Sequence, residues 1–198
     1  MEFKELKPIF LQEAELYYKN LRREFLVDEN NRRIFEMLCL YFSKDKDFEE
    51  KFGGQLQKGI MLFGNVGSGK TSTFQIFQNI SKKHNLKSLW FPMISTTEVV
   101  TKFNSSTNKD DIINYYSFGK YMFDDLGREK MASNFGKEDI FSRIMDSRYR
   151  EFIEKNTRTF LTTNYSLEEI SKRYGDHIYD RFSEMFNIIE MSGKTRRF

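Results

Sequence analysis

A glycine-rich segment at residues 64–72 reads GNVGSGKTS and fits the pattern G-x-x-x-x-G-K-[ST]. Glycines in such a loop let successive backbone N–H groups face a phosphate chain. The phosphate-facing loop comprises Gly64, Asn65, Val66, Gly67, Ser68 and Gly69. Lys70 would reach the β and γ phosphates, and the hydroxyl of Thr71, which precedes Ser72, would bind Mg²⁺. The segment therefore predicts a site for ATP and Mg²⁺.

Two acidic residues end a second apolar run, YMFDDLG at 121–127. In a phosphate-loop enzyme Asp124 would hold Mg²⁺, and Asp125 would orient or deprotonate the water that attacks the γ phosphate. Taken alone, two acids after a strand are often a simple turn. The phosphate loop some 50 residues earlier favours the catalytic interpretation.

A third apolar run, TRTFLTTN at 157–164, ends in polar residues. Ligands of parallel α/β sheets sit at the carboxyl ends of strands, so Asn164 is expected beside the two acids, within reach of the γ phosphate or the attacking water. The alternative is a strand end that merely turns into the next helix. Arg181, in YDRF, could stabilise phosphoryl-transfer charge. From the residues alone, an ion pair with the flanking Asp180 or Glu184 is the simpler interpretation.

Short apolar runs alternate with helix-length amphipathic ones from Lys58 onward. This alternation predicts βαβ crossovers and a parallel sheet of about five strands with helices on both faces. The second strand is expected within KSLWFPMI at 87–94 and a long helix around 137–155. The spacing of Ser166 and Glu169 is typical of a capping box and predicts a helix start there.

We divide the chain into an N-terminal helical segment, residues 1–50, and a core, residues 51–198. Two apolar stripes at helical spacing predict two amphipathic helices in the segment. The first stripe comprises Phe10, Ala14, Tyr17 and Leu21, and the second Ile34, Met37, Leu38, Tyr41 and Phe42. Both helices could pack on the core, or the first could dock on a partner protein.

The composition sets further bounds. The chain has 198 residues, 39% hydrophobic and 31% charged, which suits one globular domain. Its net charge of +3 is too near balance to indicate a nucleic-acid binder, and Lys82, Lys83 and Lys87 are expected to be the solvated end of a helix. One cysteine and two histidines cannot form a disulfide or a zinc site. Without a long apolar run or signal peptide, no membrane association and a cytoplasmic location are expected.

The order of motifs resembles the AAA+ ATPases of the DnaC-type helicase loader and IstB families. The resemblance covers roughly residues 50–198 and is carried by KGIMLFGNVGSGKTS, FDDLG, LTTN with SLEEISKRYG, DRFSEMFN and GKTRR. It implies an α/β AAA+ P-loop core with strand order 5-1-4-3-2. It also implies that Asn164 is the sensor 1 residue, that Arg181 is an arginine finger acting on a neighbouring subunit's ATP, and that Arg197 contacts ATP as sensor 2.

The chain also departs from the family pattern. Asp125 stands where many AAA+ proteins have glutamate, and its shorter side chain favours slow turnover. The chain ends at Phe198, just after the last strand and arginines, so no helical lid is expected. The segment before the core is shorter than the helicase-binding domain of typical loaders.

The resemblance implies an ATP-dependent loader that binds a DnaB-type replicative helicase and places it on single-stranded DNA during replication initiation. ATP-dependent self-assembly and slow, stimulated ATP hydrolysis would accompany that role. The alternative is an IstB-like transposition helper that acts with a transposase on duplex DNA. A small P-loop kinase would need an arginine-rich lid and an acceptor site, and the order of DDLG, LTTN and DRF disfavours it. A non-catalytic nucleotide sensor is a further hypothesis because of the shorter Asp125.

Overall fold

The computed structural model describes residues 1–133, 137–193 and 195, with backbone alone at 132–133 and 137–138. The chain forms two compact units, each described by itself. Unit 1 comprises Met1–Leu56, Asn65–Phe91 and Ile189–Phe198, and unit 2 comprises Gln57–Gly64 and Pro92–Ile188. Within the described residues, no helix is both long and apolar enough to cross a membrane.

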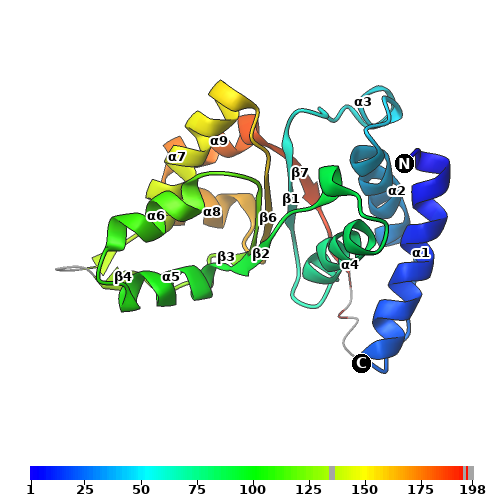
Figure 1. Cartoon of the computed structure of the whole chain (residues 1–198), viewed down its shortest axis with the longest axis horizontal. Helices are drawn as coiled ribbons and strands as arrows, with labels where there is room; N and C mark the ends of the chain where they lie inside the picture. The colour runs from blue at the N-terminus through cyan, green and yellow to red at the C-terminus, as the bar shows by residue number, and fades with distance from the viewer. Residues whose placement is uncertain (134–136, 194, 196–198) are drawn as a thin grey trace. The chain divides into compact units, whose positions relative to one another are not determined.

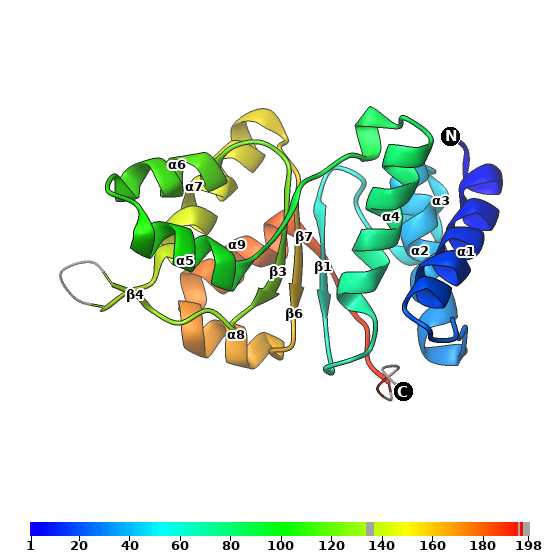
Figure 2. The same ribbon diagram turned by 60° about the horizontal axis from the view of Figure 1, so that its bottom comes forward.

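Unit 2 is built on a five-stranded parallel sheet of order β2-β3-β6-β1-β7. Its strands are β1 (Gly59–Phe63), β2 (Met93–Ser95), β3 (Tyr121–Leu126), β6 (Thr159–Thr163) and β7 (Phe186–Glu190), the last two residues of which are counted in unit 1. β6 lies between β1 and β3, with Ile60 opposite Phe160 and Tyr121 opposite Thr159 (Figure 2). When only these five strands are counted along the chain and the sheet is followed from β7 to β2, the strand order is 5-1-4-3-2. The predicted fold is therefore confirmed.

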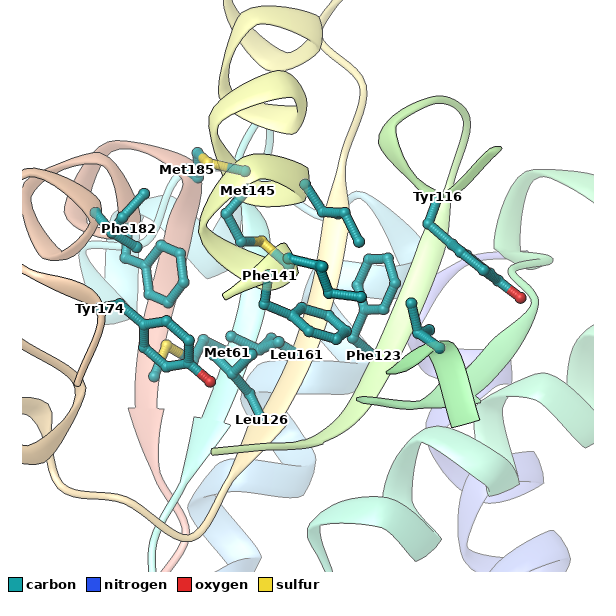
Figure 3. Packing of buried hydrophobic residues seen from close by; sticks show 14 of the residues in the cluster. Met61, Tyr116, Phe123, Leu126, Phe141, Met145, Leu161, Tyr174, Phe182 and Met185 are labelled. Carbon is teal, nitrogen blue, oxygen red and sulfur yellow. The ribbon is translucent and has the colours of Figure 1, made fainter. Parts of the chain in front are cut away.

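Helices of unit 2 pack on this sheet through one apolar core. They are α5 (Thr96–Ser105), α6 (Lys109–Ser117), α7 (Ile140–Lys155), α8 (Leu167–Tyr174) and α9 (Asp176–Met185). Phe141 of α7 lies against Phe123 of β3 with the rings edge to face, 5.7 Å apart at their centroids (Figure 3). Burying these aromatic and aliphatic side chains is the main force that holds the helices on the sheet.

The connection between β3 and α7 contains an element that the sequence pattern did not indicate. β4 (Ala132–Ser133) and β5 (Lys137–Glu138) pair antiparallel as a separate two-stranded sheet. The helix predicted around 137–155 therefore begins only at Ile140, as α7. Asp139 caps it by accepting hydrogen bonds from the N–H groups of Phe141 and Ser142. Burial raises the pKa of the Asp139 carboxyl above its ordinary value.

Unit 1 is a helical layer that includes the N-terminal segment (Figure 1). Its helices are α1 (Phe3–Asn20), α2 (Glu29–Ser43), α3 (Asp47–Phe52), α4 (Lys70–Lys83) and the 3₁₀ turn η1 (Lys87–Leu89). Phe77 of α4 joins the layer, with ring centroids 4.7 Å from Phe10 of α1 and 4.2 Å from Phe42 of α2. Helix α1 thus packs on a helix of the predicted core, and the division at residue 50 stays a prediction.

Two details of the N-terminal helices differ from the predicted stripes. The buried face of α1 carries Tyr18 in place of Tyr17 and Leu21. The helix ends at Asn20, so Leu21 leaves the stripe and is exposed, while Tyr17 turns aside and its hydroxyl donates to Gln75. Helix α3 was not predicted.

The second strand is shorter than predicted. Residues 87–89 form η1, and β2 starts only at Met93. Pro92 has no N–H to donate, and its carbonyl accepts the first ladder bond, from the N–H of Met122 at 2.9 Å. The capping box at α8 is confirmed, because the Ser166 hydroxyl accepts from the N–H of Glu169, whose carboxylate accepts from the N–H of Ser166.

Candidate functional site

The phosphate loop links β1 to α4. Gly67 and Gly69 have φ angles of +83° and +102°, in the region that side chains disfavour, so glycine is needed at both turns. Helix α4 then begins at Lys70, which places its N-terminal N–H groups and the positive end of its dipole at the loop. The loop therefore has the backbone geometry that binds a phosphate chain.

The side chain of Lys70, the first residue of α4, contacts the loop. Its ammonium donates to the carbonyl of Asn65 at 2.8 Å and to the hydroxyl of Ser68 at 3.4 Å, and the side chain is buried. A phosphate oxygen would be a stronger acceptor than either partner, because it carries charge. The position of Lys70 thus suits the predicted contact with phosphate.

Segments from both ends of unit 1 contact this loop. The hydroxyl of Tyr18 and the methyl of Met191 each lie 3.4 Å from where a Cβ at Gly69 would be. A Cβ at Gly67 would lie 2.3 Å from the Thr195 hydroxyl, so Thr195 lies against the loop. Arg197, predicted to contact ATP, lies outside the described residues. Sequence patterns gave no signal for Tyr18 or Met191.

The two predicted acids of unit 2 stand on a bulge in β3. The register against β6 shifts between Phe123 and Leu126, so one extra residue is inserted there. Asp125 has φ +60°, a left-handed conformation that costs a non-glycine residue about 1–2 kcal/mol. The strand continues past the acids to Leu126 instead of ending at them.

Thr162 of β6 holds the bulge in place. Its hydroxyl accepts from the N–H of Asp125 at 2.9 Å and donates to the Asp124 carboxylate at 2.5 Å. Thr162 is fully buried, so this threonine positions both acids from the neighbouring strand. The polar residues at the end of β6 were the sequence signal for Thr162, although its pairing with the acids was not predicted.

The carboxylate of Asp125 lies between an amide and a guanidinium. The Asn164 amide donates to Oδ1 at 3.3 Å, which brings together the two predicted residues as expected. Arg128 pairs with Oδ2 at 2.8 Å, and its side chain is 68% exposed. The carboxylate is thus oriented by two partners, of which Arg128 is mostly exposed to solvent.

A buried polar cluster supports the turn that follows. Glu129 is buried, and its carboxylate accepts from the N–H of Gly127 at 2.8 Å and from the Tyr174 hydroxyl. Arg173 pairs with the same carboxylate at 3.3 Å. Burial raises the pKa of Tyr174, so its hydroxyl stays protonated as a donor. These residues tie α8 to the acidic turn, and sequence reasoning missed them.

Arg181 of α9 does not pair with either flanking acid. Its guanidinium contacts the Asp146 carboxylate of α7 and lies 5.1 Å from the ring centroid of Tyr149. The side chain is about one third exposed. Arg181 therefore forms an ion pair, as the simpler interpretation expected, but with Asp146 of α7 and not with Asp180 or Glu184.

No set of three or more His, Cys, Asp or Glu side chains in the described residues could hold a metal ion. The predicted Mg²⁺ ligands are the Thr71 hydroxyl and the Asp124 carboxylate. Both are oxygen donors, the type that Mg²⁺ prefers, and such sites use few protein ligands beside phosphate and water. The chemistry of this donor set fits Mg²⁺.

No protein-family model and no curated protein matches the chain. Solved structures do resemble it. The DnaC helicase loader aligns with 90% of this chain and 99% of its own at a TM-score of 0.61 and 18% identity. DnaI aligns with 84% of this chain and 87% of its own at a TM-score of 0.57 and 19% identity. The replication initiator DnaA, bound to AMPPCP and single-stranded DNA, aligns with 87% of this chain and 50% of its own at a TM-score of 0.53 and 18% identity. At these identities the comparisons establish an AAA+-like fold.

Proposed function

We propose that the chain is an ATP-dependent helicase loader, which binds a DnaB-type replicative helicase and assists its loading on single-stranded DNA. The observation that carries this proposal is the fold, which aligns with nearly the whole of the DnaC helicase loader, together with a phosphate loop and the Asp125–Asn164 pair. A DnaA structure of similar fold is bound to an ATP analogue and single-stranded DNA, which supports ATP as the nucleotide and DNA as a partner.

Each residue has a role in this proposal. The loop N–H groups and Lys70 bind the phosphates, and Thr71 and Asp124 would hold Mg²⁺, which would neutralise phosphate charge when bound. Asp125 accepts a proton from the attacking water, while Asn164 orients that carboxylate. Thr162 keeps both acids in place through its two hydrogen bonds. Arg197 is proposed to contact ATP, as the resemblance implies for sensor 2.

The experiment that tests this function mixes the purified chain with the replicative helicase of its source, in ATP or in ADP. Complex mass is measured by light scattering after size exclusion. We expect a complex whose amount depends on the nucleotide. No complex with either nucleotide would contradict the loader function, and the IstB-like alternative would then predict a complex with a transposase and a preference for duplex DNA.

Arg181 is proposed as an arginine finger that acts on the ATP of a neighbouring subunit. Arg181→Ala is expected to bind ATP normally but to lose stimulated hydrolysis by about a thousandfold or more, the usual contribution of such a finger. The measurement is phosphate release with helicase and single-stranded DNA present. Arg143→Ala, which removes another partly exposed, ion-paired arginine of unit 2, is the matched control and should hydrolyse normally.

A mixing experiment separates a finger acting between subunits from one acting within a subunit. Arg181→Ala retains Asp125, and Asp125→Asn retains Arg181, so a mixed assembly contains interfaces where both residues are intact. Mixing the two inactive variants should restore part of the hydrolysis. Wild-type rates for Arg181→Ala in the assembled state would show that the finger assignment is wrong.

A further inference from the structure

A basic, aromatic surface lies where α4 ends in unit 1. Lys82, Asn85, Lys87 and Trp90 are all exposed there, and we name these four residues the Trp90 patch. Residues 51–97 contain six lysines and no aspartate or glutamate. Lys82, Lys83 and Lys87 are exposed, as expected, but the structure adds an aromatic ring that the sequence pattern had assigned to a strand.

Trp90 is exposed because its neighbours are anchored inward. Leu89 and Phe91 are both buried, so the side chain between them points outward with 39% of its surface exposed. Buried side chains hold this turn: Gln78 donates to the carbonyl of Phe91 at 3.0 Å, and Ser81 donates to the carbonyl of Leu86 at 2.9 Å. The ring is therefore presented by a fixed backbone, which lowers the entropy cost of binding.

The four residues of the Trp90 patch surround a hollow in the surface. A cavity of about 220 Å³ is lined by Ser81, Lys82, Asn85, Lys87 and Trp90. Among these lining residues there are two ammonium groups, one amide and one indole ring, and no carboxylate. The Lys82 ammonium lies 5.0 Å from the centre of the indole ring. A cation beside an aromatic face is the arrangement that accepts a stacked base and its phosphate.

A second hollow, of about 290 Å³, continues the surface toward α1. Lys82 lines both hollows, and Tyr17 lines the second. Lys83 also lines the second hollow, but its ammonium pairs with Glu13 at 2.5 Å, so its charge is largely neutralised. Glu13 also lines the second hollow, but among the described residues it pairs with Lys83, so Lys82 and Lys87 are the cations of this surface that form no ion pair.

We propose that the Trp90 patch binds single-stranded DNA, with one base stacked on the indole of Trp90 and the adjoining phosphates contacted by Lys82 and Lys87. Asn85 offers an amide donor and acceptor to the base edge. Single strands fit this surface because their bases are free to stack on a side chain, whereas duplex bases are already stacked. This inference rests on the proposed function for its biological role, and it names the DNA-contacting residues of that function.

The test uses the fluorescence of Trp90, which is the only tryptophan of the chain. The full-length protein is titrated with an oligothymidylate of about 15 nucleotides, at several salt concentrations. We expect saturable quenching and an affinity that falls as salt rises. A duplex of the same length should quench weakly; equal quenching by duplex would overturn the stacking of a base on Trp90.

Variants locate the site, with binding followed by the anisotropy of labelled DNA. Trp90→Ala should bind about 5- to 150-fold more weakly, and Trp90→Phe, which keeps a ring, should recover most of the affinity. The Lys82→Gln/Lys87→Gln double variant should reduce the slope of log affinity against log salt by about 1.4. Lys4→Gln/Lys46→Gln removes the same charge from exposed sites of unit 1 and is the matched control.

The outcomes distinguish this inference from the proposed function. DNA binding without a change in Trp90 fluorescence, and unaltered by the patch variants, would overturn the assignment of the site while leaving the loader function standing. No binding of single-stranded DNA in ATP would overturn the inference together with the DNA partner of that function. The helicase complex, measured separately with the Trp90→Ala variant, tests the loader function without depending on the patch.

Discussion

Asp125→Asn is expected to slow ATP hydrolysis by about 100- to 10,000-fold, the usual contribution of a general base, with ATP binding almost unchanged. An amide cannot take a proton from water at neutral pH, whereas the Asp125 carboxylate can. Asparagine has nearly the same size, and it tolerates the left-handed conformation at φ +60° that this position requires. The bulge in β3 should therefore survive the change.

The measurement is single-turnover phosphate release, with nucleotide affinity determined in parallel by a fluorescent ATP analogue. Arg128→Gln is the control, because Arg128 pairs with the same carboxylate at 2.8 Å but leaves the base in place. Its side chain is mostly exposed, so the ion pair contributes little to stability. We expect Arg128→Gln to hydrolyse ATP at least as fast as the wild type. Hydrolysis by Asp125→Asn at the wild-type rate would contradict the role of Asp125, whereas no hydrolysis by the wild type itself would favour a nucleotide sensor.

Arg148→Ala is expected to lower the free energy of unfolding by about 3–5 kcal/mol. The guanidinium is fully buried, and it donates to the Thr159 hydroxyl at 2.8 Å and to the carbonyls of Tyr116 and Gly119 at 2.7 and 2.6 Å. Alanine would leave these acceptors without their donor and would open a cavity. The loss of several buried hydrogen bonds places this change among the most damaging single substitutions.

Aromatic rings complete the environment of this cation. The guanidinium carbon lies 5.2 Å from the ring centroid of Phe123 and 5.7 Å from that of Tyr121. Burial lowers the pKa of Arg148 to about 10, so the side chain remains charged at neutral pH. Through these contacts Arg148, on α7, links that helix to the end of α6 and to β3 and β6.

Urea unfolding followed by circular dichroism checks this prediction, with the slope m compared between variants. Arg150→Ala is a matched control, because Arg150 lies on the same helix α7 two residues later and is exposed. It should change the free energy of unfolding by less than about 0.5 kcal/mol. An Arg148→Ala midpoint equal to that of Arg150→Ala would show that the buried hydrogen bonds contribute nothing to stability.

Local patterns in the sequence predicted the turn between β1 and α4 and the start of α8. The phosphate loop and the capping box at Ser166 depend on backbone conformations that a few consecutive residues specify, so they are readable without the fold. Alternation of apolar runs predicted a parallel sheet, and the resemblance supplied its strand order. Asn164 was expected beside the acids because parallel strands end at one edge, and it lies beside Asp125.

Contacts between residues distant in the sequence account for what was missed. Periodicity does not show which of many charged residues is buried, so Arg148 looked like any other charge on a helix. The bulge that turns Asp125 depends on pairing with Thr162, 37 residues away. Trp90 fitted a strand pattern, yet the anchoring of Leu89 and Phe91 turns its ring to the surface. Composition and spacing specify local backbone geometry, whereas burial and side-chain pairing depend on which distant segments pack together.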